Sequence, residues 1–178
     1  GSADRSCQVW ESSTWRPVVT LQQADAVQGV AMSPDGELLA MAIAGPDEKG
    51  LRLRRRDNQQ DVRFMDVGPA MPLDLIWSAQ GNKLYVPCSD KAVRVFDAGS
   101  GGQTGYFTGH GDWVHRGSLT ADGARLVTAS ADGSVKLWNT ADGKLLATLL
   151  QLTPRSDEWL IGTYAGYLMT SAPGAVTW

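Results

Sequence analysis

Residues 109–139 read GHGDWVHRGSLTADGARLVTASADGSVKLWN, with a Gly-His pair at the start and a Trp-Asn pair at the end. Between these pairs lie three short runs of β-type residues, at 113–119, 125–130 and 134–138. Turns ending in Asp-Gly separate the runs, because glycine accepts the positive φ of a tight hairpin turn without steric cost. With a fourth apolar run at 144–150, the segment predicts one four-stranded antiparallel sheet. Such a sheet is apolar on both faces, so it needs similar sheets beside it to be stable.

The rest of the chain repeats this unit. Trp138, which closes the third run, has counterparts at Trp10, Arg54, Phe96 and Trp178, spaced 40 to 44 residues apart. The opening residues SADRSCQVW align without a gap on SADGSVKLW, which ends at Trp138. A period near 40 residues with four strands per unit is typical of β-propeller blades.

On these residues the sequence resembles the WD40-repeat β-propeller family, in a bacterial form that is a partial propeller. The resemblance is strongest in the unit that ends at Trp138 and weakest in the unit that ends at Arg54. It implies an all-β fold of four-stranded antiparallel blades, about four per chain. We expect one domain over 1–178, with blade units at approximately 28–67, 73–107, 113–150 and 158–178, the last completed by an N-terminal strand within 6–21.

Four blades lie at the low end of the range for propellers. An open stack also leaves apolar sheet faces at both ends, which favours association. Two interpretations follow: the chain is a fragment of a longer chain with more blades, or two chains form a homodimer, a ring of about eight blades under two-fold symmetry. We expect the homodimer.

Composition limits the possible partners and compartments. The net charge of −3 gives no basic field for nucleic acid. The longest apolar run, 38–44, is too short to cross a bilayer, so we expect no membrane partner. Cys7 and Cys88 fall on different units and are not expected to form a disulfide. This cysteine usage neither establishes nor excludes an oxidising compartment, although the cytoplasm is favoured.

The resemblance implies a hydrogen-bonded chain of four side chains, His110, Thr128, Asp132 and Trp138. Ser130 is the alternative hydroxyl, because it lies two residues further along and on the same strand face. Asp, His and a hydroxyl together resemble a hydrolase triad, but this hydroxyl lies inside a sheet with no oxyanion hole in view. We therefore expect the four residues to be structural and the chain to have no catalytic residues.

A metal site is also not expected. His110, Asp112 and His115 are close in sequence, but the chain has only two histidines and no third strong ligand at a suitable spacing. No motif for a cofactor is present, and we expect neither metal nor cofactor.

One basic cluster alternates with leucines in 51–55, which places Arg52 and Arg54 on the same strand face. Two interpretations stay open for these arginines: a solvated blade face, or a docking patch for an acidic partner. Because Arg54 stands where a tryptophan is expected, we expect this blade to be the least rigid.

The function that the sequence favours is a non-catalytic scaffold that binds a protein or peptide at the propeller face, since loops on a rigid platform commonly carry binding. The alternative is a structural or regulatory propeller module of a larger bacterial enzyme or redox protein whose activity lies outside this chain. An enzyme that uses the propeller mouth is disfavoured, because no acid, base or metal cluster converges there. The candidate partner-binding residues are Gln28, Asp74, Trp113, His115, Asp157, Arg52 and Arg54.

Overall fold

The computed structural model describes residues 1–152 and 157–171, which form sixteen strands and no helix. The predicted all-β fold class is therefore confirmed. In this part of the chain no helix has the length and apolar character needed to cross a membrane.

The described strands form one hairpin and three larger antiparallel sheets. The hairpin contains β1 (Ser6–Glu11) and β2 (Arg16–Gln22). Blade 1 contains β3 (Val27–Met32), β4 (Leu38–Ala44), β5 (Lys49–Arg55) and β6 (Asp61–Asp66). Blade 2 contains β7 (Ile76–Trp77), β8 (Lys83–Pro87), β9 (Ala92–Asp97) and β10 (Gln103–Thr108). Blade 3 contains β11 (Val114–Leu119), β12 (Arg125–Ser130), β13 (Ser134–Asn139) and β14 (Leu145–Gln151), and β15 (Trp159–Thr163) and β16 (Leu168–Thr170) continue its sheet.

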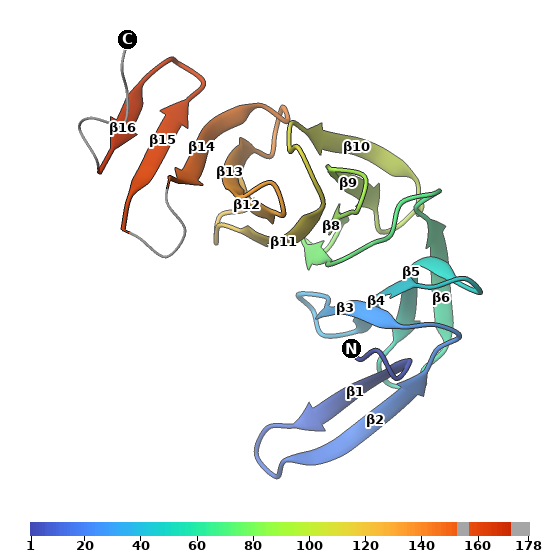
Figure 1. Cartoon of the computed structure of the whole chain (residues 1–178). Coiled ribbons are helices and arrows are strands. Elements are labelled where there is room, and N and C mark those ends of the chain that lie inside the picture. The colour runs from blue at the N-terminus through green and yellow to red at the C-terminus, as the bar shows by residue number, and fades with distance from the viewer. Residues whose placement is uncertain (153–156, 172–178) are drawn as a thin grey trace.

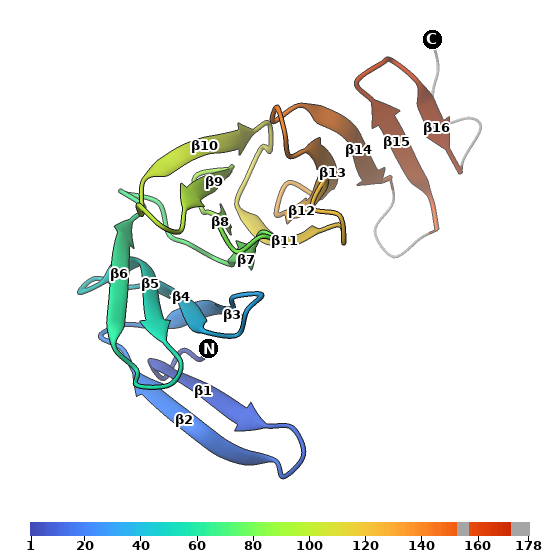
Figure 2. The same cartoon turned by 180° about the vertical axis from the view of Figure 1, so that it is seen from behind.

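The sheets follow one another along an open arc (Figures 1 and 2). Each blade begins with a strand on the inner side of the arc and ends with one on the outer side. The hairpin of β1 and β2 lies at one end of the arc, and β15 and β16 lie at the other. The first and last described strands are consequently far apart.

The turns explain why the units repeat so regularly. In blade 3, the backbone amide of Ser134 donates to Asp132 Oδ1 (2.8 Å), and Gly133 takes a φ of 81°. At the aligned turn before β1, the Ser6 amide donates to Asp4 Oδ1 (2.9 Å), and Arg5 takes a φ of 70°. The alignment of the opening residues on SADGS therefore corresponds to the same local conformation.

Three apolar clusters hold neighbouring sheets together, and each lies between two of them. Cys7 and Leu21 of the hairpin pack with Ile43 of blade 1. Leu53 of blade 1 packs in one cluster with Phe96 of blade 2. Between blades 2 and 3 the cluster contains Tyr85, Val93, Val95, Phe107, Val114, Leu126 and Trp138. Burial of a Leu- or Phe-sized side chain stabilises the fold by about 1.5–3 kcal/mol, so these contacts account for the stacking.

The end of the chain differs from the expected arrangement. β15 pairs with the outer strand β14 through five residue pairs, so it extends the sheet of blade 3 rather than opening a separate blade. β2 pairs with β1, and within the described residues it does not join the strands at the other end of the arc. The expected third strand at 174–178, with Trp178, lies outside the described residues.

Candidate functional site

Four side chains of blade 3 form a continuous hydrogen-bonded chain. His110 Nδ1 lies 3.0 Å from Asp132 Oδ2, and His110 Nε2 lies 2.7 Å from Thr128 Oγ1. The Trp138 indole N–H donates to the same Thr128 hydroxyl at 2.8 Å. These distances fit a neutral imidazole that donates to the carboxylate and accepts from the hydroxyl. Of the two hydroxyls considered in the sequence, the structure places Thr128 in this chain.

Burial and hydrogen bonding together set the protonation of His110 and Asp132. It lowers the pKa of His110 below 6.5, although the Asp132 carboxylate favours the imidazolium. Burial also opposes ionisation of Asp132, but hydrogen bonds from Ser134, the Gly111 amide and His110 outweigh it. The pKa of Asp132 therefore lies well below its usual range. The pair is consequently an ionised carboxylate beside a neutral imidazole at pH 7.

The same cluster fixes the loop that precedes β11. Asp132 Oδ2 accepts a hydrogen bond from the Gly111 amide at 2.7 Å. Ser130 Oγ donates to the Asp112 carbonyl at 3.0 Å, and the Asp112 carboxylate accepts from the Trp113 amide at 2.8 Å. Ser130 therefore has a separate task, since it holds the loop that carries Trp113.

Trp113 and His115 lie together at the surface. The Trp113 side chain is 42% exposed, and its ring centroid lies 6.2 Å from that of His115. Between them, Val114 is fully buried in the cluster of blades 2 and 3. Buried Val114 and the hydrogen-bonded loop fix the backbone on both sides of Trp113 and leave its indole partly exposed.

Asp74 lies at the junction of blades 2 and 3 rather than on a free surface. Its carboxylate is 3.4 Å from Arg116 Nη1 and accepts from the Gly117 amide at 3.3 Å. Blade 1 also approaches, because a Cβ on Gly29 would lie 3.1 Å from the Asp74 Cα. Asp74 therefore bonds to β11 of blade 3 and lies close to β3 of blade 1.

The other candidates are spread over the arc. Gln28 is exposed on β3 at the inner side of blade 1, whereas Asp157 lines a groove at the other end of the arc. Arg52 and Arg54 are engaged within blade 1, because both pair with Asp61 and Arg52 also pairs with Glu48. Among the candidate partner-binding residues, the described part of the chain brings Trp113 together with His115 as a ring pair, and Arg52 together with Arg54 through their shared partner Asp61.

The arginine pairs favour the first interpretation of the basic cluster. Arg52 also lies 5.7 Å from the centre of the Phe64 ring, so its charge has partners on two sides. Because the acidic groups are supplied by the blade itself, the patch has little free charge for an acidic partner.

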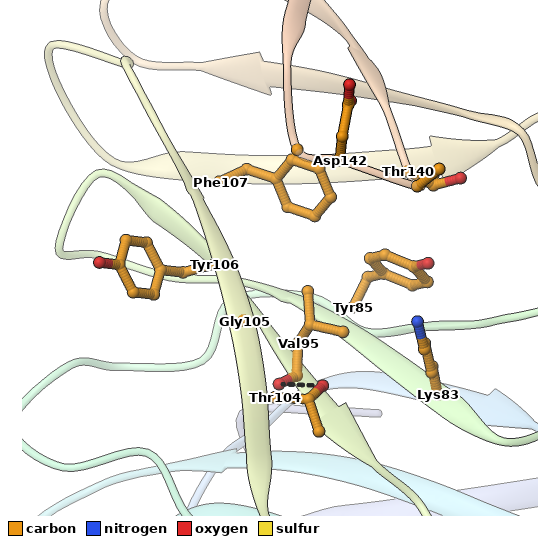
Figure 3. A pocket seen from close by; sticks show the side chains of 11 residues that line it. Lys83, Tyr85, Val95, Thr104, Gly105, Tyr106, Phe107, Thr140 and Asp142 are labelled. Carbon is orange, nitrogen blue, oxygen red and sulfur yellow. Dashed lines mark hydrogen bonds between the residues drawn. The ribbon is translucent and has the colours of Figure 1, made fainter.

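Blade 2 has an apolar side chain at the position of Trp138, so it lacks the hydrogen bond that the indole makes in blade 3. Leu84 pairs with Phe96 as Leu126 pairs with Trp138, so Phe96 occupies the tryptophan position. Figure 3 shows Tyr85, Val95 and Phe107 of blade 2 around a pocket of about 270 Å³ that is closed on the other side by the turn of Thr140 and Asp142. The apolar side chains of this face receive blade 3, since the Phe107 and Trp138 ring centroids are 5.8 Å apart.

Groups that could perform metal or thiol chemistry do not converge. Across residues 1–152 and 157–171, no group of three or more His, Cys, Asp or Glu side chains is arranged to hold a metal ion. Burial raises the pKa of the Cys88 thiol to about 12, with a further contribution from Asp90, so the thiolate that acts as a nucleophile is not formed at pH 7.

Stacked antiparallel sheets of four or more strands, one of which contains an Asp–His–Thr–Trp hydrogen-bonded chain, resemble blades built from WD40-type repeats. In agreement, residues 101–139 match the family model described as "WD domain, G-beta repeat". This range contains all of β10, β11, β12 and β13, together with the four hydrogen-bonded residues. The match and the relatives below support the WD40-repeat family.

Three curated proteins illustrate the similarity. The B-type cell cycle switch protein ccs52B of Medicago truncatula is 25% identical over 142 residues, which cover 78% of this chain and 29% of that protein. Protein FIZZY-RELATED 3 of Arabidopsis thaliana is 23% identical over 167 residues, or 91% of this chain and 34% of that protein. The serine-threonine kinase receptor-associated protein of Gallus gallus is 21% identical over 171 residues, or 96% and 46%. The chain thus spans less than half the length of each relative.

Proposed function

We propose that this chain is a non-catalytic scaffold for protein–protein interaction, and that the surface formed by Trp113 and His115 binds a protein or peptide segment. The observation that carries the proposal is the combination of exposure and fixation at Trp113. An indole that is 42% exposed stands on a loop held by Asp132, Ser130 and Asp112. Partly exposed aromatic side chains on rigid supports make good anchors, because little conformational freedom is lost on binding.

The neighbouring charges indicate the chemistry of the bound segment. The Arg116 side chain is 66% exposed, and Asp74 contacts only one side of its guanidinium, at 3.4 Å. A segment with an apolar side chain for the indole and a carboxylate for Arg116 fits this surface. The rings of Trp113 and His115 and the charge of Arg116 lie within four consecutive residues of β11 and its entry loop, so one short peptide can contact all three.

Peptide selection followed by calorimetry tests this function. Peptides selected from a displayed random library on the wild-type protein should bind Trp113→Ala at least about 30-fold more weakly, since anchor tryptophans commonly contribute about 2 kcal/mol or more. Trp15→Ala is the matched control, because Trp15 is 79% exposed but lies in the turn between β1 and β2. Selected peptides that bind Trp113→Ala as tightly as the wild type would contradict the assignment.

The proposal includes self-association. The arc has unfinished ends, and two copies related by two-fold symmetry form a ring of about eight blades. If the chain is instead a fragment of a longer protein, additional blades of that protein take the place of the second copy. A bacterial source stays a prediction, since the relatives above come from Medicago, Arabidopsis and Gallus.

A further inference from the structure

The two ends of the arc carry complementary surfaces. At the last blade, a groove of about 640 Å³ lies on the face of β13, β14 and β15, and Val135, Leu149, Trp159 and Ile161 are among the residues that line it. At the first end, Trp10 on β1 is 52% exposed. The groove and Trp10 each correspond to one side of a contact that is already formed between blades 2 and 3.

The completed contact is the junction of blades 2 and 3. There, Trp138 packs on Phe107 of the preceding blade and is only 1% exposed. Phe107 pairs with Val93 across β9 and β10, and Leu149 pairs with Val135 in the same way across β13 and β14. The groove at Leu149 therefore repeats the face that receives Trp138, one blade further along.

The first end repeats the other side of that junction. Trp10 pairs with Pro17 as Trp138 pairs with Leu145, so the two tryptophans have the same place in their hairpins. The turns before their strands also match, as described for Asp4 and Asp132. The hairpin thus presents a tryptophan in the orientation that this kind of face accepts.

We propose that Trp10 of a second copy of this chain occupies the groove at Val135 and Leu149, which joins the copies head to tail. This inference rests on the self-association proposed above and identifies its contact. A second copy is the occupant that the structure favours, because one chain carries both the tryptophan and the groove. Two such contacts close a two-fold ring, and both unfinished ends are then covered. A fully buried aromatic side chain removes roughly 150–250 Å² from water, and the contact would bury the 52% of Trp10 that is exposed in one copy, which makes this residue the anchor of each contact.

Sedimentation velocity over a concentration series tests the contact with two charged variants. Trp10→Glu removes the tryptophan, and Leu149→Glu places a charge in the groove, where the leucine is 38% exposed. The wild type should sediment as a dimer, and each variant should have a dissociation constant at least about 100-fold higher. Trp15→Glu is the control and should dimerise like the wild type. A far-UV circular dichroism spectrum identical to the wild type shows that each variant is folded.

Mixing the two variants gives the sharper result. Trp10→Glu still has an intact groove and Leu149→Glu still has Trp10, so an equimolar mixture should form a heterodimer through one complete contact. If the mixture associates no better than either variant alone, or if Trp10→Glu dimerises like the wild type, the head-to-tail contact is wrong. A monomeric wild type overturns the self-association as well. Peptide binding at Trp113 is measured separately, so failure here leaves that function standing.

Discussion

Thr128 is the residue through which the histidine and the tryptophan of blade 3 are coupled. Its hydroxyl accepts from the Trp138 indole and, as a donor, satisfies the neutral His110 ring. Thr128 is completely buried, so no water can replace it for either neighbour without a rearrangement. A buried donor or acceptor that loses its partner costs about 1–3 kcal/mol.

We predict that Thr128→Val lowers the free energy of unfolding by about 2–4 kcal/mol, because it leaves two buried groups without partners. The double variant Thr128→Val with Trp138→Phe should cost less than the sum of the two single changes. It reproduces the apolar solution of blade 2, where Val86 and Phe96 are both buried. Urea unfolding measures all three, and strictly additive costs would contradict the coupling.

A second prediction concerns pH. The pKa of His110 is lowered by burial from 6.5, so the unfolded chain binds the proton more readily than the folded one. The stability due to the neutral ring is therefore complete above pH 6.5 and is lost as the pH falls toward the lower folded pKa. Between pH 7 and 5 the free energy of unfolding should fall in the wild type and stay nearly flat in His110→Gln. Parallel profiles for the two proteins would contradict this origin.

At the level of residues, the resemblance supplied the four hydrogen-bonded positions but not their support. Ser134 donates to Asp132 Oδ1 at 2.7 Å and lies 3.2 Å from His110 Nδ1. Its only sequence signal is its position two residues after Asp132, where short hydroxyl side chains commonly bond to a turn aspartate. The contacts of Asp74 at the blade junction could not be predicted from the neighbouring sequence, because its partners Arg116 and Gly117 are more than 40 residues away.

At the level of the strands, blade 1 is deeply buried although Arg54 stands in place of its tryptophan. The loss of the tryptophan at Arg54 suggested a loose blade, yet six of the seven residues of β4 are buried. The reason is position, since the hairpin covers one face of blade 1 and blade 2 covers the other. Every residue of β14 keeps some exposure, because the face of blade 3 away from blade 2 carries the groove.

Hydrogen exchange should show this order directly. In the monomeric Trp10→Glu variant, we predict that amides of β4 and β5 exchange more slowly than those of β14 and β15, because blade 1 is covered on two faces and the groove side of blade 3 is open. Mass spectrometry of peptides from both regions measures the difference. Faster exchange in β4 than in β14 would show that the tryptophan, rather than coverage by neighbouring blades, determines rigidity.

The ion pairs of blade 1 should contribute little to its stability. The Asp61 side chain is 46% exposed, and pairs between exposed charges are typically worth about 0–1 kcal/mol. Asp61→Asn should therefore change the free energy of unfolding by less than about 1 kcal/mol, and the change should shrink further in high salt. A loss comparable to that of Thr128→Val would mean that these pairs hold the blade together.

Strand order within the blades could be predicted from alternation and turn residues, but one strand is shorter than expected. The run at 73–77 forms a ladder only over Ile76–Trp77, with an isolated bridge from Pro72 to Cys88. Proline has no amide to donate and interrupts a ladder. The effect of a proline on the ladder depends on whether its nitrogen faces the neighbouring strand, and the sequence does not specify this.

At the scale of the whole molecule, the repeat predicts stacked blades but not how the series ends. β15 has the same alternation and the same backbone groups whether it opens a new blade or pairs with β14. An unpaired strand edge accepts any strand of suitable register, and β14 offers such an edge until β15 pairs with it. Whether β15 pairs with β14 or opens a new blade therefore depends on what covers the last blade. We expect a second copy to change the exposure of β14 and β15 more than that of any other described strands.

The central claim is that the sheets are stable because each packs its face on the next around a common centre. A nuclear Overhauser spectrum of the isotope-labelled protein tests it at the junction of blades 2 and 3, where the ring centroids of Phe107 and Trp138 lie 5.8 Å apart. We predict cross-peaks between the protons of these two rings and between the Trp138 indole and His110, whose centroids are 6.0 Å apart. A spectrum with the contact inside blade 3 but none to Phe107 would contradict the stacked arrangement.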